Sequence, residues 1–274
     1  MFEHTPSRGG RIGIMAAMPE ELQALLDAMP DEAMVTRAGR QFWVGHLNGR
    51  DVVAVLSRIG KVAAATTTTL LLTEFGVTQV LFTGVAGGLG AGVNVGDVVV
   101  ASSLVQHDMD ASPLFPRFEL PGLGARSLQP PAALTDWVAD VVAEVLSPAS
   151  LAEGGALSGV HLGELGLGQP RVHRGLVISG DQFIHSAQAC HALLQALPEA
   201  MAVEMEGAAV AQVCHDFGVP WAIIRTISDR ADDEAHIDFP RFIKAVASRY
   251  SLAIVQALTA RQQGDSHESL PVVR

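Results

Sequence analysis

The chain alternates short runs rich in β-branched residues with longer Ala- and Leu-rich stretches, and this pattern restricts its fold more than any other feature. Such alternation is typical of β-α units around a largely parallel sheet. The short runs predict strands at residues 11–16, 51–58, 79–83, 97–105, 175–179 and 221–226. The longer stretches predict helices at residues 20–29, 61–75, 132–146, 187–196, 206–217 and 240–261. We therefore expect an α/β fold.

The predicted elements form one continuous series, which we interpret as a single domain over residues 11–261. A Gly- and Pro-containing segment at residues 147–170 has weak periodicity and is predicted to be an inserted surface loop. The termini, residues 1–10 and 262–274, are expected to be flexible.

The charge of the chain points to a small ligand. A formal net charge of −11 disfavours nucleic acid and anionic membranes, since both select Lys/Arg patches. No apolar run approaches the roughly 18 residues of a membrane span, and the first residues lack the apolar core of a signal peptide. Cys190 and Cys214 stand alone, without the spacing of a zinc site or a disulfide framework. We expect a cytoplasmic protein.

The first predicted strand ends in acids. Ile12 to Ala17 are apolar, and Met18-Pro19-Glu20-Glu21 then supplies two carboxylates and no turn glycine. Many α/β proteins place a glycine-rich phosphate-binding turn at this position. This loop should instead repel phosphate.

Two later stretches bring further polar groups to strand ends. Glu204 and Glu206 lie where an extended segment passes into a helix, and a spacing of two puts them on one side of that segment. Arg225, Ser228 and Asp229 end an apolar strand. Each group taken alone is explained as well by helix capping or by the helix dipole.

Small residues make the same edge accessible. Gly84, Gly87 and Gly88 follow another strand, where the missing side chains let the backbone approach a ligand. Open α/β sheets bind ligands at the carboxyl ends of their strands. Three acids there, Glu21, Glu206 and Asp229, suggest cleavage of a glycosidic bond, in which carboxyl groups divide the tasks of acid, base and cation stabilisation.

Eight ordered motifs carry a family resemblance: IGIMAAMPEEL, IGKVAAA, TGVAGGL, VGDVVVAS, HDMD, SGDQFI, AVEMEGAAVAQVC and RTISDRAD. Over residues 11–261, apart from the segment 147–170, the chain resembles the 5′-methylthioadenosine/S-adenosylhomocysteine nucleosidases of the nucleoside phosphorylase superfamily. The resemblance implies a three-layer α/β sandwich with a central mixed, largely parallel sheet flanked by helices, and a homodimer. It also implies release of adenine from 5′-thio-substituted nucleosides by water, in methionine salvage and recycling of S-adenosylmethionine by-products, with no cofactor.

The catalytic roles follow from the resemblance residue by residue. Asp229 is expected to protonate adenine N7, with Ser228 orienting it. Glu206 is expected to hold the ribose hydroxyls. Glu21 is expected to hold the attacking water near Arg225.

The resemblance further implies contacts to each part of the nucleoside. Phe183 is expected to stack on adenine while the backbone of Ile184 reads its edge, and Met205 is expected to pack under the ribose. The 5′-thioether is expected in an apolar pocket that a neighbouring subunit closes. The remaining residues implied are Met18, Ile59, Val85, Ala86, Gly87, Glu204 and Phe239, with Ala111, Leu114 and Pro121 contributed across the dimer interface.

Two positions depart from the family pattern. Val85 stands where the family usually has serine or threonine, so one hydrogen bond near the water is lost. His185 replaces the usual asparagine. Neither of these two changes removes an acid, so we expect an altered rate or substrate preference rather than lost activity. His107, Asp108 and Asp110 resemble metal ligands but lack the further ligands of a zinc or calcium site, and no metal is expected.

Three other functions remain open. A phosphorylase would need a cationic loop in place of Glu20 and Glu21. A hydrolase of a larger nucleoside, such as futalosine, would share the acids but need a different 5′ pocket. A nucleoside-binding or storage protein would have no reason to keep all of Glu21, Glu206 and Asp229.

Overall fold

The centre of the molecule is one nine-stranded mixed sheet. The computed structural model describes residues 10–230 and 239–261, except for the side chains of Phe239 and Pro240. The strands are β1 (Arg11–Ala16), β2 (Ala33–Arg37), β3 (Arg40–Leu47), β4 (Arg50–Leu56), β5 (Val77–Gly88), β6 (Val98–Gln106), β7 (Val172–Ser179), β8 (Ala200–Glu204) and β9 (Trp221–Asp229). They follow the order β2-β3-β4-β1-β5-β8-β7-β6-β9.

The long strand β5 organises the sheet. One edge pairs with β9, in parallel, from Val80 to Gly87. The opposite edge pairs first with β1, up to Thr83, and then in antiparallel fashion with β8, from Gly87 onward. Because β9 also pairs with β6, the second half of the sheet closes into a ring, β5-β8-β7-β6-β9.

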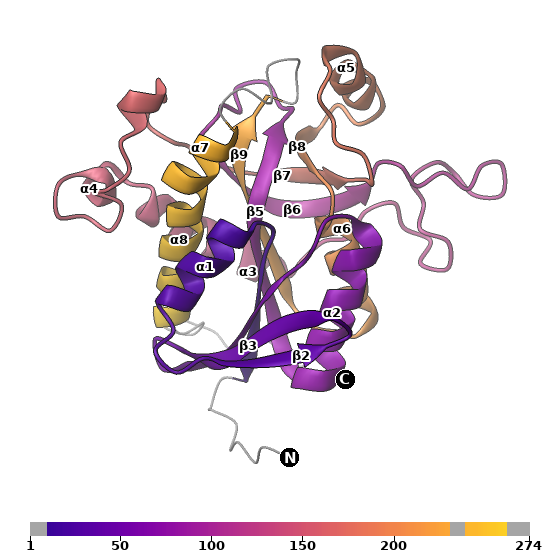
Figure 1. The fold of residues 1–274 in the computed structure, drawn as a ribbon. Helices are drawn as coiled ribbons and strands as arrows, with labels where there is room; N and C mark the ends of the chain where they lie inside the picture. Colours follow the sequence, from indigo (N-terminus) through magenta and orange to yellow (C-terminus); the bar gives the residue numbers. More distant parts are fainter. Residues whose placement is uncertain (1–9, 231–238, 262–274) are drawn as a thin grey trace.

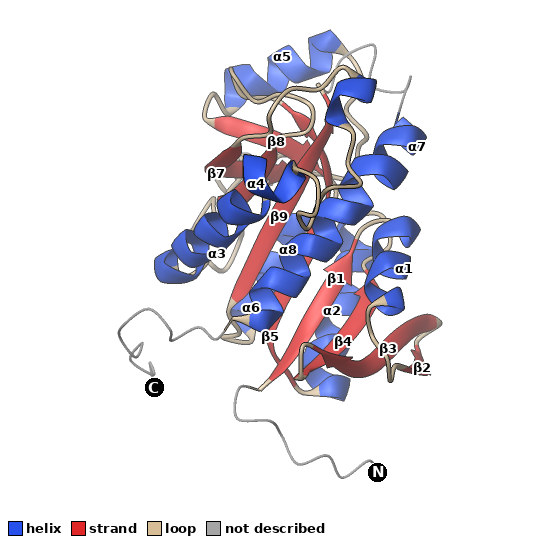
Figure 2. Ribbon diagram, turned by 90° about the vertical axis from the view of Figure 1, so that its left-hand side faces the viewer, coloured by secondary structure: helices blue, strands red, loops and turns tan. Residues whose placement is uncertain are grey.

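Helices cover both faces of the sheet, as Figures 1 and 2 show. Helices α1 (Pro19–Asp27), α3 (Ala132–Val145) and α8 (Ser248–Ala260) share one hydrophobic cluster with the sheet. Helices α2 (Lys61–Phe75) and α6 (Gly207–Asp216) pack against the other face. The fold is therefore the expected α/β sandwich. No helix in the described part of the chain has the length and apolarity needed to cross a membrane.

The remaining helices are short or peripheral. They are α4 (Pro148–Leu151), the 3₁₀-helix η1 (Leu162–Leu165), α5 (Ala187–Ala196), α7 (Phe239–Phe242) and the π-helix η2 (Ile243–Ala247). Together α7, η2 and α8 occupy the single helix predicted over residues 240–261, so that prediction missed a π-turn inside it.

Three strands were missing from the sequence prediction. The hairpin β2–β3 extends the sheet beyond β4, and β2 is largely exposed, so its pattern of apolar and polar residues is weak. β8 has only five residues and was predicted merely as an extended segment. Short or half-exposed strands are held by pairing with their neighbours, which local periodicity does not report.

The segment 147–170 is not a plain surface loop. It contains α4 and η1, and it buries Leu157 and Val160 in the same hydrophobic cluster as α3 and α8. The prediction of an inserted surface loop did not include these two buried residues, because isolated leucine and valine anchors carry no periodic signal. The predicted flexible termini lie outside the described residues, apart from Gly10.

Candidate active site

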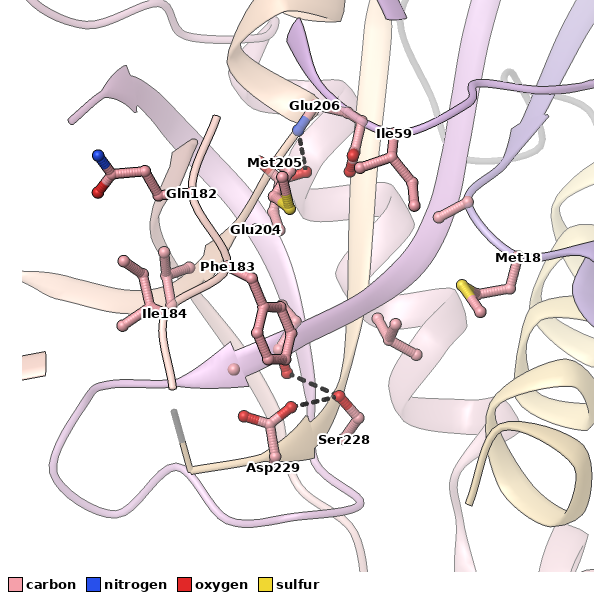
Figure 3. A pocket seen from close by; sticks show the side chains of 15 residues that line it. Met18, Ile59, Gln182, Phe183, Ile184, Glu204, Met205, Glu206, Ser228 and Asp229 are labelled. Atoms are coloured by element: carbon pink, nitrogen blue, oxygen red, sulfur yellow. Dashed lines mark hydrogen bonds between the residues drawn. The ribbon is translucent and has the colours of Figure 1, made fainter. Parts of the chain in front are cut away.

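A cavity of about 230 Å³ lies at the carboxyl ends of β1, β8 and β9 (Figure 3). Most of its wall is apolar, and all of its charged lining groups are acids. The lining residues are Ala17, Met18, Ile59, Val85, Ala86, Gly87, Gln182, Phe183, Ile184, Val203, Glu204, Met205, Glu206, Ser228 and Asp229.

The sheet itself creates this cavity. β1 leaves the edge of β5 after Thr83, and β8 joins the same edge only at Gly87. Between these points Val85 and Ala86 keep β9 on one side and pair with no described strand on the other. The opened edge places β5 backbone against the cavity, which explains why this end of β5 is rich in small residues.

A buried ion pair joins Glu204, which lines the cavity, to Arg225 behind the lining. Arg225 is 0% exposed, and its Nη2 and Nε lie 2.6 and 3.2 Å from Glu204 Oε2. The same carboxylate accepts hydrogen bonds from the backbone N–H groups of Glu206 and Gly207 and from the Ser179 hydroxyl. A buried charge needs such compensation. We call Ser179, Glu204 and Arg225 the buried cluster.

Gly84 makes room for the guanidinium. A Cβ at Gly84 would lie 2.9 Å from Arg225 Nη1 and 2.8 Å from the Ala17 side chain. On its other side, the guanidinium lies 4.0 Å from the centroid of the Phe82 ring, a cation-π distance. This glycine inside β5 thus serves the packing of Arg225 as well as the shape of the cavity.

Glu206 has a different environment from Glu204. It lines the cavity, and its Oε1 accepts a hydrogen bond of 3.0 Å from the Gly60 N–H. Burial, followed by the negative charge of Glu204, raises the pKa of Glu206 to about 7, while the Arg225 charge and the hydrogen bonds oppose the shift. The group can therefore change its protonation state near neutral pH.

Asp229 ends β9 and lines the cavity, as Phe183 also does (Figure 3). The Ser228 hydroxyl lies 2.8 Å from Asp229 Oδ2 and 3.4 Å from the carbonyl oxygen of Ala86. The hydroxyl is thus in place to orient the carboxyl group. Phe183 is about half exposed, with its ring stacked near His185 at a centroid distance of 6.1 Å.

Glu21 lies behind the cavity wall rather than on it. It is 0% exposed, and the Met18 N–H and the Ser251 hydroxyl donate to its two oxygens at 3.0 and 2.7 Å. The Met18 contact is a helix-capping interaction at the start of α1. Burial raises the pKa of Glu21, and the hydrogen bonds and the Arg225 charge oppose that shift.

Hydrogen bonds connect the segments that follow β4, β6 and β7, beside Glu206. The Lys61 ammonium binds Gln106 and Asp108 at 3.0 and 2.6 Å. Asp108 and Asp181 in turn accept the backbone N–H groups of Asp181 and Lys61. Asp108 is thus engaged in structural contacts, and within the described residues no three His, Cys, Asp or Glu side chains gather as a metal site.

The structure brings most of the predicted site residues together. Glu21 and Arg225 lie behind the lining, and the side chain of Phe239 is outside the described part of the chain. Sequence reasoning missed Ala17, Gln182, Val203, Gly60 and Ser251. Gln182 and Gly60 stand inside two of the recognised motifs, SGDQFI and IGKVAAA, whereas Ser251 had no sequence signal.

The residues predicted to act across a dimer interface lie apart from the cavity lining. Ala111, Leu114 and Pro121 belong to the segment between β6 and α3, which projects from the body of the molecule (Figure 1). Leu114 is 84% exposed and Pro121 is also exposed. Their role in a partner's pocket stays a prediction.

Comparison with known proteins agrees with this geometry. The phosphorylase superfamily model matches residues 11–260. The 5′-methylthioadenosine/S-adenosylhomocysteine nucleosidase of Shewanella baltica strain OS195 is 36% identical, with 93% of this chain and 98% of the relative covered. That of Shewanella halifaxensis is 34% identical, with 90% and 98% covered.

Solved structures give the same result. The Neisseria meningitidis 5′-methylthioadenosine/S-adenosylhomocysteine nucleosidase in complex with methylthio-immucillin-A has a TM-score of 0.78 and 32% identity, with 92% of this chain and 100% of that chain covered. Futalosine hydrolase of Helicobacter pylori has a TM-score of 0.76 and 34% identity, with 91% and 97% covered. The chain belongs to the phosphorylase superfamily and is a homologue of its 5′-methylthioadenosine/S-adenosylhomocysteine nucleosidases.

Proposed function

We propose that this protein hydrolyses the N-glycosidic bond of 5′-methylthioadenosine and S-adenosylhomocysteine, and also that of 5′-deoxyadenosine. The products are adenine and the free 5-thioribose compound, or 5-deoxyribose from the last substrate. The observation that carries the proposal is the cavity itself, which combines an apolar wall with carboxyl groups at the ends of β8 and β9. Homology to nucleosidases supports the same reaction.

We assign protonation of the leaving base to Asp229. When the bond between C1′ and N9 breaks, its electron pair moves into the purine, and a proton delivered to N7 neutralises the leaving base. Ser228 orients the Asp229 carboxyl group for this transfer. Phe183, which also lines the cavity, stacks on the base.

We assign the reactions at the sugar to Glu206 and Glu21. Glu206 as a carboxylate accepts hydrogen bonds from the ribose hydroxyls and stabilises the positive charge that develops at C1′. Water adds to C1′ and gives its proton to Glu21. Because Glu21 lies behind Met18, this role requires the attacking water to reach it through the wall at the start of α1.

The charge of the wall favours water over phosphate as nucleophile. Of the described residues that line the cavity, the charged ones are Glu204, Glu206 and Asp229. The nearby guanidinium of Arg225 is already held by Glu204. An incoming phosphate dianion would therefore meet uncompensated negative charge in a partly desolvated space.

A futalosine hydrolase activity is the second candidate, because a protein of that name matches this chain as well as the nucleosidases do. The lining favours the smaller substrates. Met18 and Ile59 offer an apolar surface where we place the 5′ substituent, and such a surface suits the thioether of a 5′-alkylthio group.

One assay separates these reactions. Purified protein is incubated with 5′-methylthioadenosine, S-adenosylhomocysteine, 5′-deoxyadenosine and futalosine, with and without inorganic phosphate, and the released base and sugar are identified. We expect adenine and free sugar at a rate that phosphate does not change. A sugar 1-phosphate would show phosphorolysis, and cleavage of futalosine alone would assign the second candidate.

We further propose that the active unit is a homodimer. Leu114 is a large apolar side chain left almost fully exposed in the single chain, which supports a contact across an interface. Sedimentation should give a dimer, and Leu114→Arg should produce a less active monomer. A fully active wild-type monomer would contradict the assignment of Ala111, Leu114 and Pro121.

A further inference from the structure

The carboxylate of Glu21 is held by a residue from the other end of the chain. Ser251, on α8, donates its hydroxyl to Glu21 Oε1 at 2.7 Å, and both side chains are buried. The Met18 N–H binds the second oxygen at 3.0 Å. Each carboxylate oxygen thus has a neutral donor. The backbone donors belong to the start of α1, so among the described partners of Glu21 it is Ser251 that depends on how α8 packs.

The π-helix η2 determines which residue of α8 faces Glu21. η2 and α8 form one continuous helix and both pack against α1. A π-turn adds one residue, and each residue turns an α-helix by about 100°. In an uninterrupted α-helix of the same sequence, Ser251 would be turned away from this position by about 100°, and Glu21 would lose the Ser251 hydroxyl as donor. π-Turns of this kind occur frequently at functional sites.

We propose that Ser251 is a positioning residue, whose hydroxyl holds the Glu21 carboxylate in the orientation from which it accepts the proton of the attacking water. This inference rests on the proposed hydrolytic function. Ser251 is not among the described residues that line the cavity, and its hydroxyl is bound to Glu21, through which it would reach the reaction.

The hydrogen bond also lowers the pKa of Glu21 and so favours its charged form. Among the described residues packed around Glu21, β9 contributes the Arg225 charge, and α1, α8 and the backbone at Ala17 and Met18 contribute neutral groups. Burial raises the pKa of Glu21, and the Ser251 hydroxyl is the first of the contacts that lower it again. Removal of the hydroxyl should therefore raise the pKa of Glu21 further.

The test compares Ser251→Ala with Ser248→Ala. Ser248 is also buried on α8, but its hydroxyl donates to the Lys244 carbonyl of the preceding helical turn. For Ser251→Ala we expect kcat to fall on the order of tenfold, as for a lost hydrogen bond to a charged group, with KM within about twofold. The acidic limb of the kcat profile should move to higher pH. Ser248→Ala should match the wild type.

A double-mutant cycle makes the test independent of a general loss of packing. In a Glu21→Gln background, Ser251→Ala should cause no further fall in kcat, because the group it positions is gone. The inference is overturned if Ser251→Ala behaves like Ser248→Ala, or if it lowers kcat by the same factor in both backgrounds. Failure of the proposed function is seen separately, as a wild-type protein that releases no base from any nucleoside.

Discussion

Glu204 and Glu206 stand two residues apart, yet the structure gives them opposite environments. Glu204 is bound by the Arg225 guanidinium, two backbone amides and the Ser179 hydroxyl. Glu206 faces the cavity with one backbone donor from Gly60, and its pKa is raised to about 7. Because its charge is compensated by these partners, Glu204 has a structural role. The charge of Glu206 is compensated less completely, so this carboxyl group can change its protonation state or bind a substrate.

Removal of the cation of the buried cluster should have the largest effect on stability. Arg225→Met leaves the Glu204 charge buried without its partner, and we expect the free energy of unfolding to fall by about 3–5 kcal/mol. Urea denaturation measures it. Arg174→Met is the matched control, because Arg174 pairs with Asp136 and Asp140 on the exposed surface and should cost under about 1 kcal/mol. Equal losses of unfolding free energy in the two variants would contradict the structural role of the buried cluster.

The cavity acids should show the reverse behaviour, with large effects on turnover and small ones on stability. Asp229→Asn retains a hydrogen-bond donor but has no acidic proton to transfer, so kcat should fall on the order of a thousandfold. Binding of an unreactive nucleoside analogue, measured by calorimetry, should change little. Near-normal turnover would exclude Asp229 as the acid.

The adjacent acids Glu20 and Glu21 after the first strand should differ in their effect on turnover. Glu21→Gln should lower kcat on the order of a hundredfold, because an amide cannot accept the proton of the water. Glu20→Gln is the control, since Glu20 is exposed in the first turn of α1 and acts there only on the helix dipole. Steady-state kinetics of both variants tests this. Similar kinetics in the two variants would contradict the role of Glu21.

The smallest predicted effect is a pH dependence of stability. Because the pKa of Glu206 is raised to about 7 in the folded protein, the folded state holds a proton that the unfolded chain releases near pH 4.5. Stability from this group is therefore present at low pH and is lost as the pH rises through about 7. Between pH 5 and 8 the loss should be on the order of 2 kcal/mol.

Denaturation of Glu206→Gln over the same pH range provides the comparison. The amide does not titrate, so its stability profile should lack the fall attributed to Glu206. A variant that keeps the full pH dependence of the wild type would place the titrating group elsewhere, with the equally buried Glu21 as the next residue to test.

The sequence predicted those parts of the fold that carry a local signal. Strong apolar runs placed β1, β5 and β9, and the Ala/Leu-rich stretches placed α2 and α3. The hairpin β2–β3 was missed because its strands are stabilised by pairing at the sheet margin and not by burial of both faces. The anchors of the segment 147–170, Leu157 and Val160, were missed because single buried residues form no pattern.

The candidate site divides in the same way. By itself the sequence determined which acids follow the strands, because polar residues after apolar runs are visible in one dimension and strand ends of an α/β sheet meet at one edge. Only the tertiary structure decided their environments. The edge of β5 opened between β1 and β8 made the cavity, Arg225 neutralised Glu204 while leaving Glu206 facing that cavity, and Ser251 reached Glu21 across 230 residues of chain. Burial and charge compensation depend on contacts between distant segments, and no local pattern encodes such contacts.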